Sequence, residues 1–274
     1  MTAGILPENL RFPAEGGLGV SLWNQWPAML RELREVGKLL VITRNADAVL
    51  GHYRSYPELT FVGEEEHLAH GGGMAIDLEP WHRALAREEQ HPNGYSYAVE
   101  IVDGRRNPIH KVCLTAESDF PRFLEWVQDH QAGMPMPSER PSAPLPASEV
   151  LFQPAPNLAE AARSLLQELM EREVEIRVAV GNQGLSQSHA FVFGEMREMG
   201  EMGEWIFCAD ADAGCHFRPA AIAHFSLEQC GCGGSSWLRA LNSRGETLFL
   251  MATTARTDLS AWTLLARRAA HASL

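Results

Sequence analysis

Histidine and cysteine are the residue types in this chain that are best suited to do chemistry. Several of them gather in one stretch of the sequence: Cys208, Cys215, His216, His224, Cys230 and Cys232. Thiolates and imidazoles are the ligands that zinc prefers in proteins. The stretch lacks the closely spaced Cys–Cys and His–His pairs of structural zinc sites, so it predicts either an irregular metal site or ordinary buried cysteines.

Two shorter patterns carry candidate ligands of other kinds. His67 and His70 flank a Leu-Ala pair in a stretch rich in glycine and glutamate, which indicates either weak metal capture or a solvated surface loop. The thioethers of Met196, Met199 and Met202 recur at every third position. They are candidate ligands of a soft metal ion, and the alternative is that they pack a connection between strands.

Composition and charge exclude several classes of partner. The chain has 274 residues, of which 45% are hydrophobic, and this is enough to build a packed core. Its formal net charge is −12, and lysine occurs only at positions 38 and 111. Nucleic acids and anionic membranes both require a basic surface, so we expect neither as a partner.

The sequence also indicates where the protein works. No apolar run approaches the roughly 18 residues of a membrane span, and the first residues lack the basic and apolar regions of a secretory signal. The 5 cysteines are odd in number and have no disulfide-framework spacing, which is typical of a reducing compartment. We therefore expect a cytoplasmic protein that does not insert into a membrane.

The chain repeats its own pattern at a nearly constant offset. Leu39–Asn45 corresponds to Ile176–Asn182, and the turn at Gly104 corresponds to the turn at Gly245. The offsets are 182 − 45 = 137 and 245 − 104 = 141. A period of this length indicates two domain-sized copies rather than a solenoid. We predict a first repeat at 20–130, a Pro-rich linker at 131–156 and a second repeat at 157–270.

Both copies predict the same mixture of elements. Trp26–Val36 is apolar at helical spacing, and Gly37 ends this helix. The composition of Gly63–Gly73 predicts a loop. Further helices are expected at Glu79–Glu89, Phe120–His130, Leu158–Glu171 and Leu259–Ala270, and strands at Lys38–Thr43, Tyr95–Val102, Ile109–Leu114, Glu175–Val180 and within Ser236–Ala252. The predicted fold class is α+β.

Several segments of the two copies resemble a known family. They are Val41–Asn45, Ala75–Leu78 and Ile109–Thr115 in the first copy, and Val180–Gly184, Gln187, His189 and Cys215–Phe217 in the second. In this order and frame they resemble the HemS/ChuS haem-utilisation proteins over roughly residues 23–128 and 157–268. The resemblance implies two tandem HemS/ChuX-like repeats, with large antiparallel sheets flanked by helices and related by pseudo-twofold symmetry.

The resemblance also implies a ligand, haem, held in a cleft between the repeats, and a haem-accepting protein as a further candidate partner. Family members supply an axial histidine from the segment that joins the repeats, but no histidine lies between His130 and His189 here. The family's opposing arginine is replaced by Glu79, and Leu227–Gly233 lacks the family's basic run. Haem would therefore need substitute ligands.

The candidate substitutes are histidines and arginines of the two repeats. His189 follows the Gly-Asn-Gln-Gly turn, and the alternatives for it are an iron ligand or a hydrogen-bonded histidine at a sheet edge. His110 lies in the Pro-Ile-His-Lys strand, where a structural role is the alternative. The remaining candidates are His216 and His52 as ligands, with Arg177 and Arg54 as partners of the haem carboxylates.

Three functions follow from these observations. The resemblance predicts a haem-binding or haem-trafficking protein. The replaced family residues predict instead a scaffold of this fold that has lost haem and binds another small ligand or a protein. Haem breakdown, proposed for some family members, would need an open site on the iron and an electron donor. Because no catalytic motif is visible in the sequence, we expect no catalytic residues.

Overall fold

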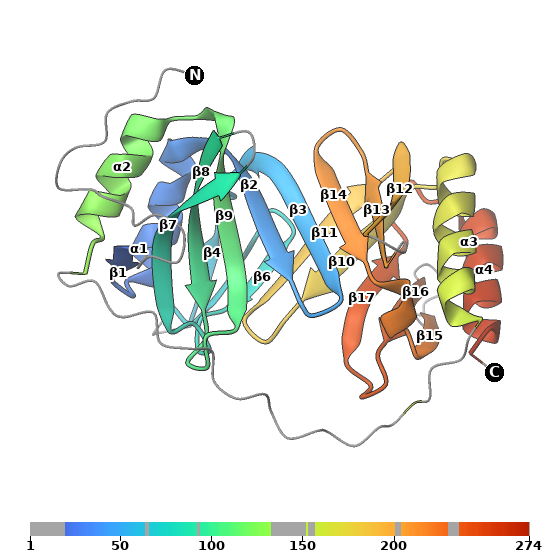
Figure 1. The fold of residues 1–274 in the computed structure, drawn as a ribbon. Coiled ribbons are helices and arrows are strands. Elements are labelled where there is room, and N and C mark those ends of the chain that lie inside the picture. Colours follow the sequence, from blue (N-terminus) through green and yellow to red (C-terminus); the bar gives the residue numbers. More distant parts are fainter. Residues whose placement is uncertain are drawn as a thin grey trace. The chain divides into compact units, whose positions relative to one another are not determined.

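A computed structural model describes residues 20–63, 66–91, 94–132, 152, 157–200, 204–229 and 236–273. In this part of the chain the strands form two large antiparallel sheets, accompanied by four α-helices (Figure 1). The predicted α+β class is therefore confirmed. None of the described helices has the length and apolar character that a membrane crossing requires. The predicted Pro-rich linker falls outside the described residues except at 131, 132 and 152.

The described residues fall into two compact units. The first is drawn from residues 1–42, 53–72 and 76–143, and the second from residues 43–52, 73–75 and 144–274. The first unit contains β1 (Val20–Leu22), α1 (Trp26–Glu32), a 3-10 turn (Leu33–Val36), β4 (Thr60–Val62), β5 (Leu68–Gly71), β7 (Arg83–His91), β8 (Gly94–Val102), β9 (Pro108–Ser118) and α2 (Phe120–Asp129). Residues from β2 (Gly37–Arg44), β3 (Ala48–Ser55) and β6 (Met74–Asp77) belong to both units.

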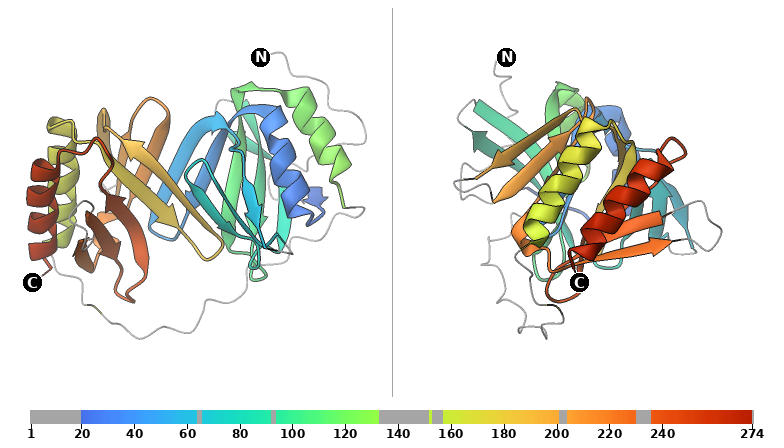
Figure 2. Two further views of the ribbon diagram at one scale, coloured as in Figure 1. Left: turned by 180° about the vertical axis from the view of Figure 1, so that it is seen from behind. Right: turned by 90° about the vertical axis from the view of Figure 1, so that its right-hand side faces the viewer.

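The second unit contains the remaining elements. They are α3 (Leu158–Glu171), β10 (Ile176–Gly181), β11 (Leu185–Phe191), β12 (Glu195–Met199), β13 (Trp205–Ala209), β14 (Ala213–Phe217), a 3-10 turn (Pro219–Ala221), β15 (His224–Gln229), β16 (Ser236–Leu241), β17 (Thr247–Ala252) and α4 (Leu259–His271). Helices α3 and α4 lie side by side (Figure 2), and Trp262 and Leu166 bury their apolar faces in one core. The indole of Trp262 donates a hydrogen bond to Ser236 Oγ at 2.7 Å.

The strand order repeats between the units. In the first unit the order is β7-β8-β9-β2, and in the second it is β15-β16-β17-β10. Side-chain contacts repeat in the same way. The hydroxyls of Thr115 and Ser118 donate to the Lys38 carbonyl at 2.7 and 2.6 Å, and the hydroxyl of Thr257 donates to the Glu175 carbonyl at 2.7 Å. Both acceptors lie at the start of their strands, Lys38 within β2 and Glu175 just before β10, and 175 − 38 equals the 137-residue offset.

The first predicted helix is confirmed as α1 followed by the 3-10 turn. Trp26, Met29 and Leu30 are buried along its inner face. Gly37 follows the turn with a φ of 90°, and a Cβ at this position would lie 3.1 Å from the Glu117 carbonyl oxygen. A side chain would therefore be strained both by the backbone angle and by the neighbouring strand.

Two local predictions are wrong. The segment Glu79–Glu89 was expected to be a helix, but most of it belongs to strand β7, which pairs with β8 and, at Leu85, also with Ser21 of β1. Ala84 and Ala86 are completely buried at alternate positions of β7. Pairing on both edges thus overrides the helical preference of alanine, leucine and glutamate. The predicted loop Gly63–Gly73 contains the strand β5.

Candidate functional site

Two histidines meet in the second unit at equivalent positions of the repeat. His52 lies on β3 and His189 on β11, and 189 − 52 = 137 is the offset that also relates Asn45 to Asn182. Their ring centroids are 4.3 Å apart with an interplanar angle of 87°, so one imidazole meets the other edge to face. The structure therefore brings together two of the predicted site residues.

A carboxylate orients one of these imidazoles. His189 Nε2 lies 2.7 Å from Asp210 Oδ2, and the two side chains are 22% and 20% exposed. Asp210 is fixed in turn, because its Oδ1 accepts hydrogen bonds at 2.9 Å from the backbone N–H groups of Asp212 and Ala213. A carboxylate bonded to one ring nitrogen fixes the tautomer and the orientation of the ring.

Buried aromatic side chains pack against the ring of His189. Phe191 contacts the His189 ring edge to face at 4.6 Å, and Phe193 stacks on Phe191 at 4.9 Å. Beside them the buried hydroxyl of Thr43 donates to Gln187 Oε1 at 2.7 Å. Gln187, His189 and Phe191 alternate along β11, so their side chains share one face of the strand.

A reciprocal pair of asparagines holds the two turns that lead into β3 and β11. Asn45 Oδ1 accepts the N–H of Ala48 and its amide donates to the Gly181 carbonyl. Asn182 Oδ1 accepts the N–H of Leu185, and its amide donates to the Arg44 carbonyl. Each turn is thus fastened to the strand before the other turn, which fixes the register of the two histidine-bearing strands.

His216 does not join this pair. It lies on β14 opposite Val49 of β3, whereas His52 pairs with Ala213, three residues away. Because side chains alternate along a strand, His216 and His52 face opposite sides of the sheet. The His216 ring packs on Phe207 at 4.8 Å, and burial lowers its pKa.

His110 belongs to the first unit and to its core. Its Nδ1 lies 3.0 Å from the Ile42 carbonyl oxygen, and its Nε2 lies 3.2 Å from Tyr56 Oη. Burial is the main cause that lowers its pKa to about 4; the bond to Ile42 opposes this shift, and the charge of Arg54 adds to it. A neutral, fully bonded imidazole of this kind fits a structural role.

The two predicted arginines lie elsewhere. Arg177 is exposed on β10, and its Nη1 lies 3.4 Å from Ser188 Oγ. Val178, rather than Arg177, pairs with His189, so Arg177 faces the opposite side of the sheet from His189. Arg54 lies in the first unit, where its Nη1 donates to the Gly72 carbonyl at 2.6 Å and burial lowers its pKa.

The predicted metal stretch does not form a cluster in the described part of the chain. Among the described residues no three His, Cys, Asp or Glu side chains are grouped as metal ligands. Cys208 and Cys215 face each other on β13 and β14, and burial raises the pKa of Cys208 to about 12 and that of Cys215 well above its ordinary value. Cys230 and Cys232 lie outside the described residues.

The other candidate ligands are dispersed. His67 and His70 are exposed, and the neighbouring glutamates 64 and 65 lie outside the described residues. Met196 is packed against the core of the second unit, whereas Met199 is 44% exposed. Met202 also lies outside the described residues.

Asp210 is the residue of the site that sequence analysis missed. It stands in an Ala-Asp-Ala-Asp-Ala-Gly stretch between β13 and β14. Aspartate at such a position is typical of a turn in which the side chain bonds its own backbone two residues on. The sequence could therefore have predicted the turn, but not that the second carboxylate oxygen of Asp210 would reach His189.

Comparison with known proteins supports the fold. No protein-family model and no curated protein matches this sequence. Holo-PhuS, a heme-binding protein from Pseudomonas aeruginosa, superposes with a TM-score of 0.74 at 19% identity over 92% of this chain and 86% of that chain. ChuS, a heme degrading enzyme of Escherichia coli O157:H7, gives 0.74 at 16% identity with the same coverage. The chain therefore has the fold of these proteins, as the resemblance predicted.

Proposed function

We propose that this protein binds haem and takes part in haem trafficking. The fold is shared with PhuS and ChuS, which are described as heme-binding and heme-degrading proteins. The observation that carries the proposal is the His189 imidazole, which is partly exposed and oriented by Asp210 beside the ring of His52. An imidazole with a carboxylate on its other nitrogen is a common arrangement for a metal ligand.

The imidazole of His189 is suited to bind iron. With Nε2 bonded to Asp210, the Nδ1 of His189 has no hydrogen-bond partner among the described residues. Phe191 and Phe193 are buried beneath the same ring, and this packing holds the imidazole in place. Haem would supply the iron, and His189 would hold it, with Asp210 fixing the tautomer.

The second candidate is a scaffold of this fold that binds a different ligand. Glu79 is exposed where the resembling family has an arginine, and its N–H is held by Asp77 Oδ1 at 3.0 Å. A carboxylate at that position repels the carboxylates of haem. This candidate predicts that hemin will not bind specifically.

We further infer a cytoplasmic location, a haem-accepting protein as partner, and two functional repeats at 20–130 and 157–270 joined by 131–156. The cysteine usage and the repeated strand order support these inferences.

A hemin titration of the purified chain, followed in the Soret region, tests the proposal. We expect a saturable one-to-one shift that is abolished by His189→Ala and weakened by Asp210→Asn. His216→Ala is the matched control, because this histidine faces the other side of the sheet, and it should leave the shift unchanged. A spectrum that stays that of free hemin would favour the second candidate. Conversion of bound hemin to a bile pigment in the presence of a reductant would instead identify a degrading enzyme.

A further inference from the structure

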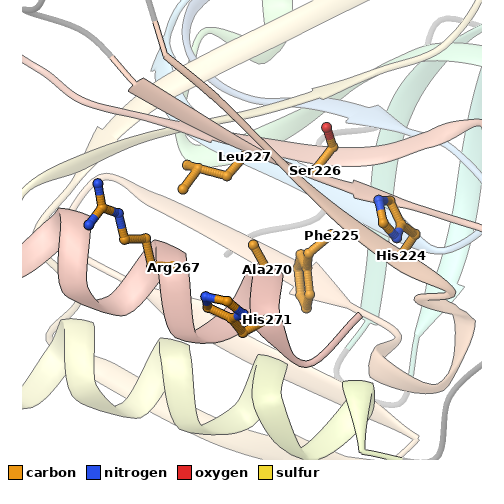
Figure 3. A pocket seen from close by; sticks show the side chains of 7 residues that line it. All are labelled: His224, Phe225, Ser226, Leu227, Arg267, Ala270 and His271. Carbon is orange, nitrogen blue, oxygen red and sulfur yellow. The ribbon is translucent and has the colours of Figure 1, made fainter. Parts of the chain in front are cut away.

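An open pocket of about 450 Å³ lies between β15 and α4 of the second unit, apart from the histidine pair. Figure 3 shows its lining. Strand β15 supplies His224 to Leu227, and α4 supplies Arg267, Ala270 and His271. The pocket thus combines apolar side chains with three that carry or can acquire a positive charge.

The apolar part forms the floor. Phe225 is only 2% exposed and belongs to the core of the unit, and Leu227 packs against the same core. Ala270 leaves space above them because its side chain is small. A floor of this kind suits the hydrocarbon body of a ligand.

The guanidinium of Arg267 is not neutralised by any residue that the structure describes. Arg267 makes no ion pair with any described residue, whereas the adjacent Arg268 is bonded to Glu168 at 2.8 Å. In Figure 3, Arg267 and His224 stand at opposite ends of the labelled group, with His271 between them. The carboxyl end of α4 contributes about half a negative charge, which the full charge of the guanidinium outweighs.

A backbone donor adds to this site. Strand β15 is an edge strand, and the N–H of Phe225 turns away from β16 to donate to Ser273 Oγ at 2.8 Å. Outward and inward N–H groups alternate along an antiparallel strand, so the N–H of Leu227 also points outward. No described group accepts that hydrogen bond.

The ring of His224 is held in place. Phe152 stacks on it with a centroid distance of 4.8 Å and an interplanar angle of 5°, and the Phe152 N–H donates to the Ser243 carbonyl at 2.9 Å. This end of the pocket is therefore preorganised, which reduces the entropy lost when a ligand binds.

We propose that the pocket binds an amphipathic carboxylate. The carboxylate accepts hydrogen bonds from Arg267 and from the N–H of Leu227, and the apolar body lies on Leu227 and Ala270. Two sources share this chemistry, namely a free aliphatic acid and the propionate edge of a porphyrin. The proposal does not require iron ligation by His189.

Calorimetric titration of the purified chain with decanoate and, separately, with metal-free protoporphyrin IX tests the proposal. We expect saturable one-to-one binding of at least one of them, weakened roughly tenfold by Arg267→Gln, because a charge-assisted hydrogen bond is removed. Arg268→Gln is the matched control and should change the affinity by less than about twofold, since that side chain pairs with Glu168. Binding of decanoate alone identifies a free aliphatic acid as the ligand, and binding of protoporphyrin IX alone identifies a porphyrin.

A second variant, Ala270→Phe, fills the pocket and should abolish binding, provided that its thermal unfolding stays close to that of the native chain. The proposal is overturned if neither probe saturates, or if Arg267→Gln and Arg268→Gln weaken binding equally. Metal-free porphyrin offers no iron to His189, and the comparison of Arg267→Gln with Arg268→Gln reports on this pocket, so these results are separate from those of the hemin titration.

Discussion

The buried imidazole of His110 should make the stability of this protein depend on pH. The side chain is 1% exposed and is bonded to Ile42 and Tyr56, and burial lowers its pKa to about 4. In the unfolded chain the pKa of histidine is about 6.5. Between these two values the unfolded state binds a proton that the folded state does not. Stability from this group is therefore present above the unfolded pKa and is lost as the pH falls toward the folded pKa.

The size of the effect follows from the two pKa values. Over the whole interval, each unit of pKa difference contributes about 1.4 kcal/mol, so the complete loss is roughly 3 kcal/mol. Between about pH 7 and about pH 5 the expected loss is about 2 kcal/mol, because protonation of the unfolded histidine is nearly complete at the lower pH.

Urea unfolding of the native chain and of His110→Gln at both pH values measures this contribution. Glutamine keeps an amide that can bond Ile42 and Tyr56 but does not titrate. The free energy of unfolding of the native chain should therefore fall by about 2 kcal/mol relative to that of His110→Gln on acidification. It should show no such fall relative to that of His67→Gln, which changes an exposed histidine. Parallel losses in the native chain and in His110→Gln would refute the assignment.

Two further predictions concern buried polar groups and thiols. Thr43→Val removes the donor to Gln187 Oε1 without leaving a cavity, and urea unfolding should show a loss of about 1–3 kcal/mol. The double variant Thr43→Val/Gln187→Leu should lose less free energy of unfolding than the two single variants lose together. Additive losses would contradict the buried hydrogen bond. Alkylation of Cys208 and Cys215 by iodoacetamide should be far slower in the folded chain than in urea, because burial raises both thiol pKa values. Equal labelling in the two states would contradict this.

The strand β7 shows where sequence reasoning about the fold fails. Its residues Arg83–Glu89 favour a helix by intrinsic propensity, and the Pro80 that precedes them suits a first helical turn. What decides the structure is pairing with β8, the next strand along the chain, and with β1, which is distant in the sequence. By contrast, the helices at Phe120 and Leu259 were predictable, because an aspartate caps each of them within one local motif.

Part of the candidate site could likewise be predicted from the sequence, and part could not. The offset of 137 residues between Asn45 and Asn182 also relates His52 to His189 in the sequence. Their contact depends on how β3 and β11 are held by the turns at Asn45 and Asn182, and no local pattern encodes such a contact. The motif resemblance could place His189 and His216 in the second repeat, but only strand register shows that β14 turns His216 to the other face.

The two equivalent histidines differ in exposure and in the turn that corresponds to each of them. The turn between β13 and β14 carries Asp210, which holds His189 partly exposed at 22% of its side chain. The corresponding turn between β5 and β6 consists of Gly72 and Gly73, which offer no carboxylate, and His52 is 4% exposed. The fold thus keeps one histidine as part of its packing and presents the other with an oriented ring.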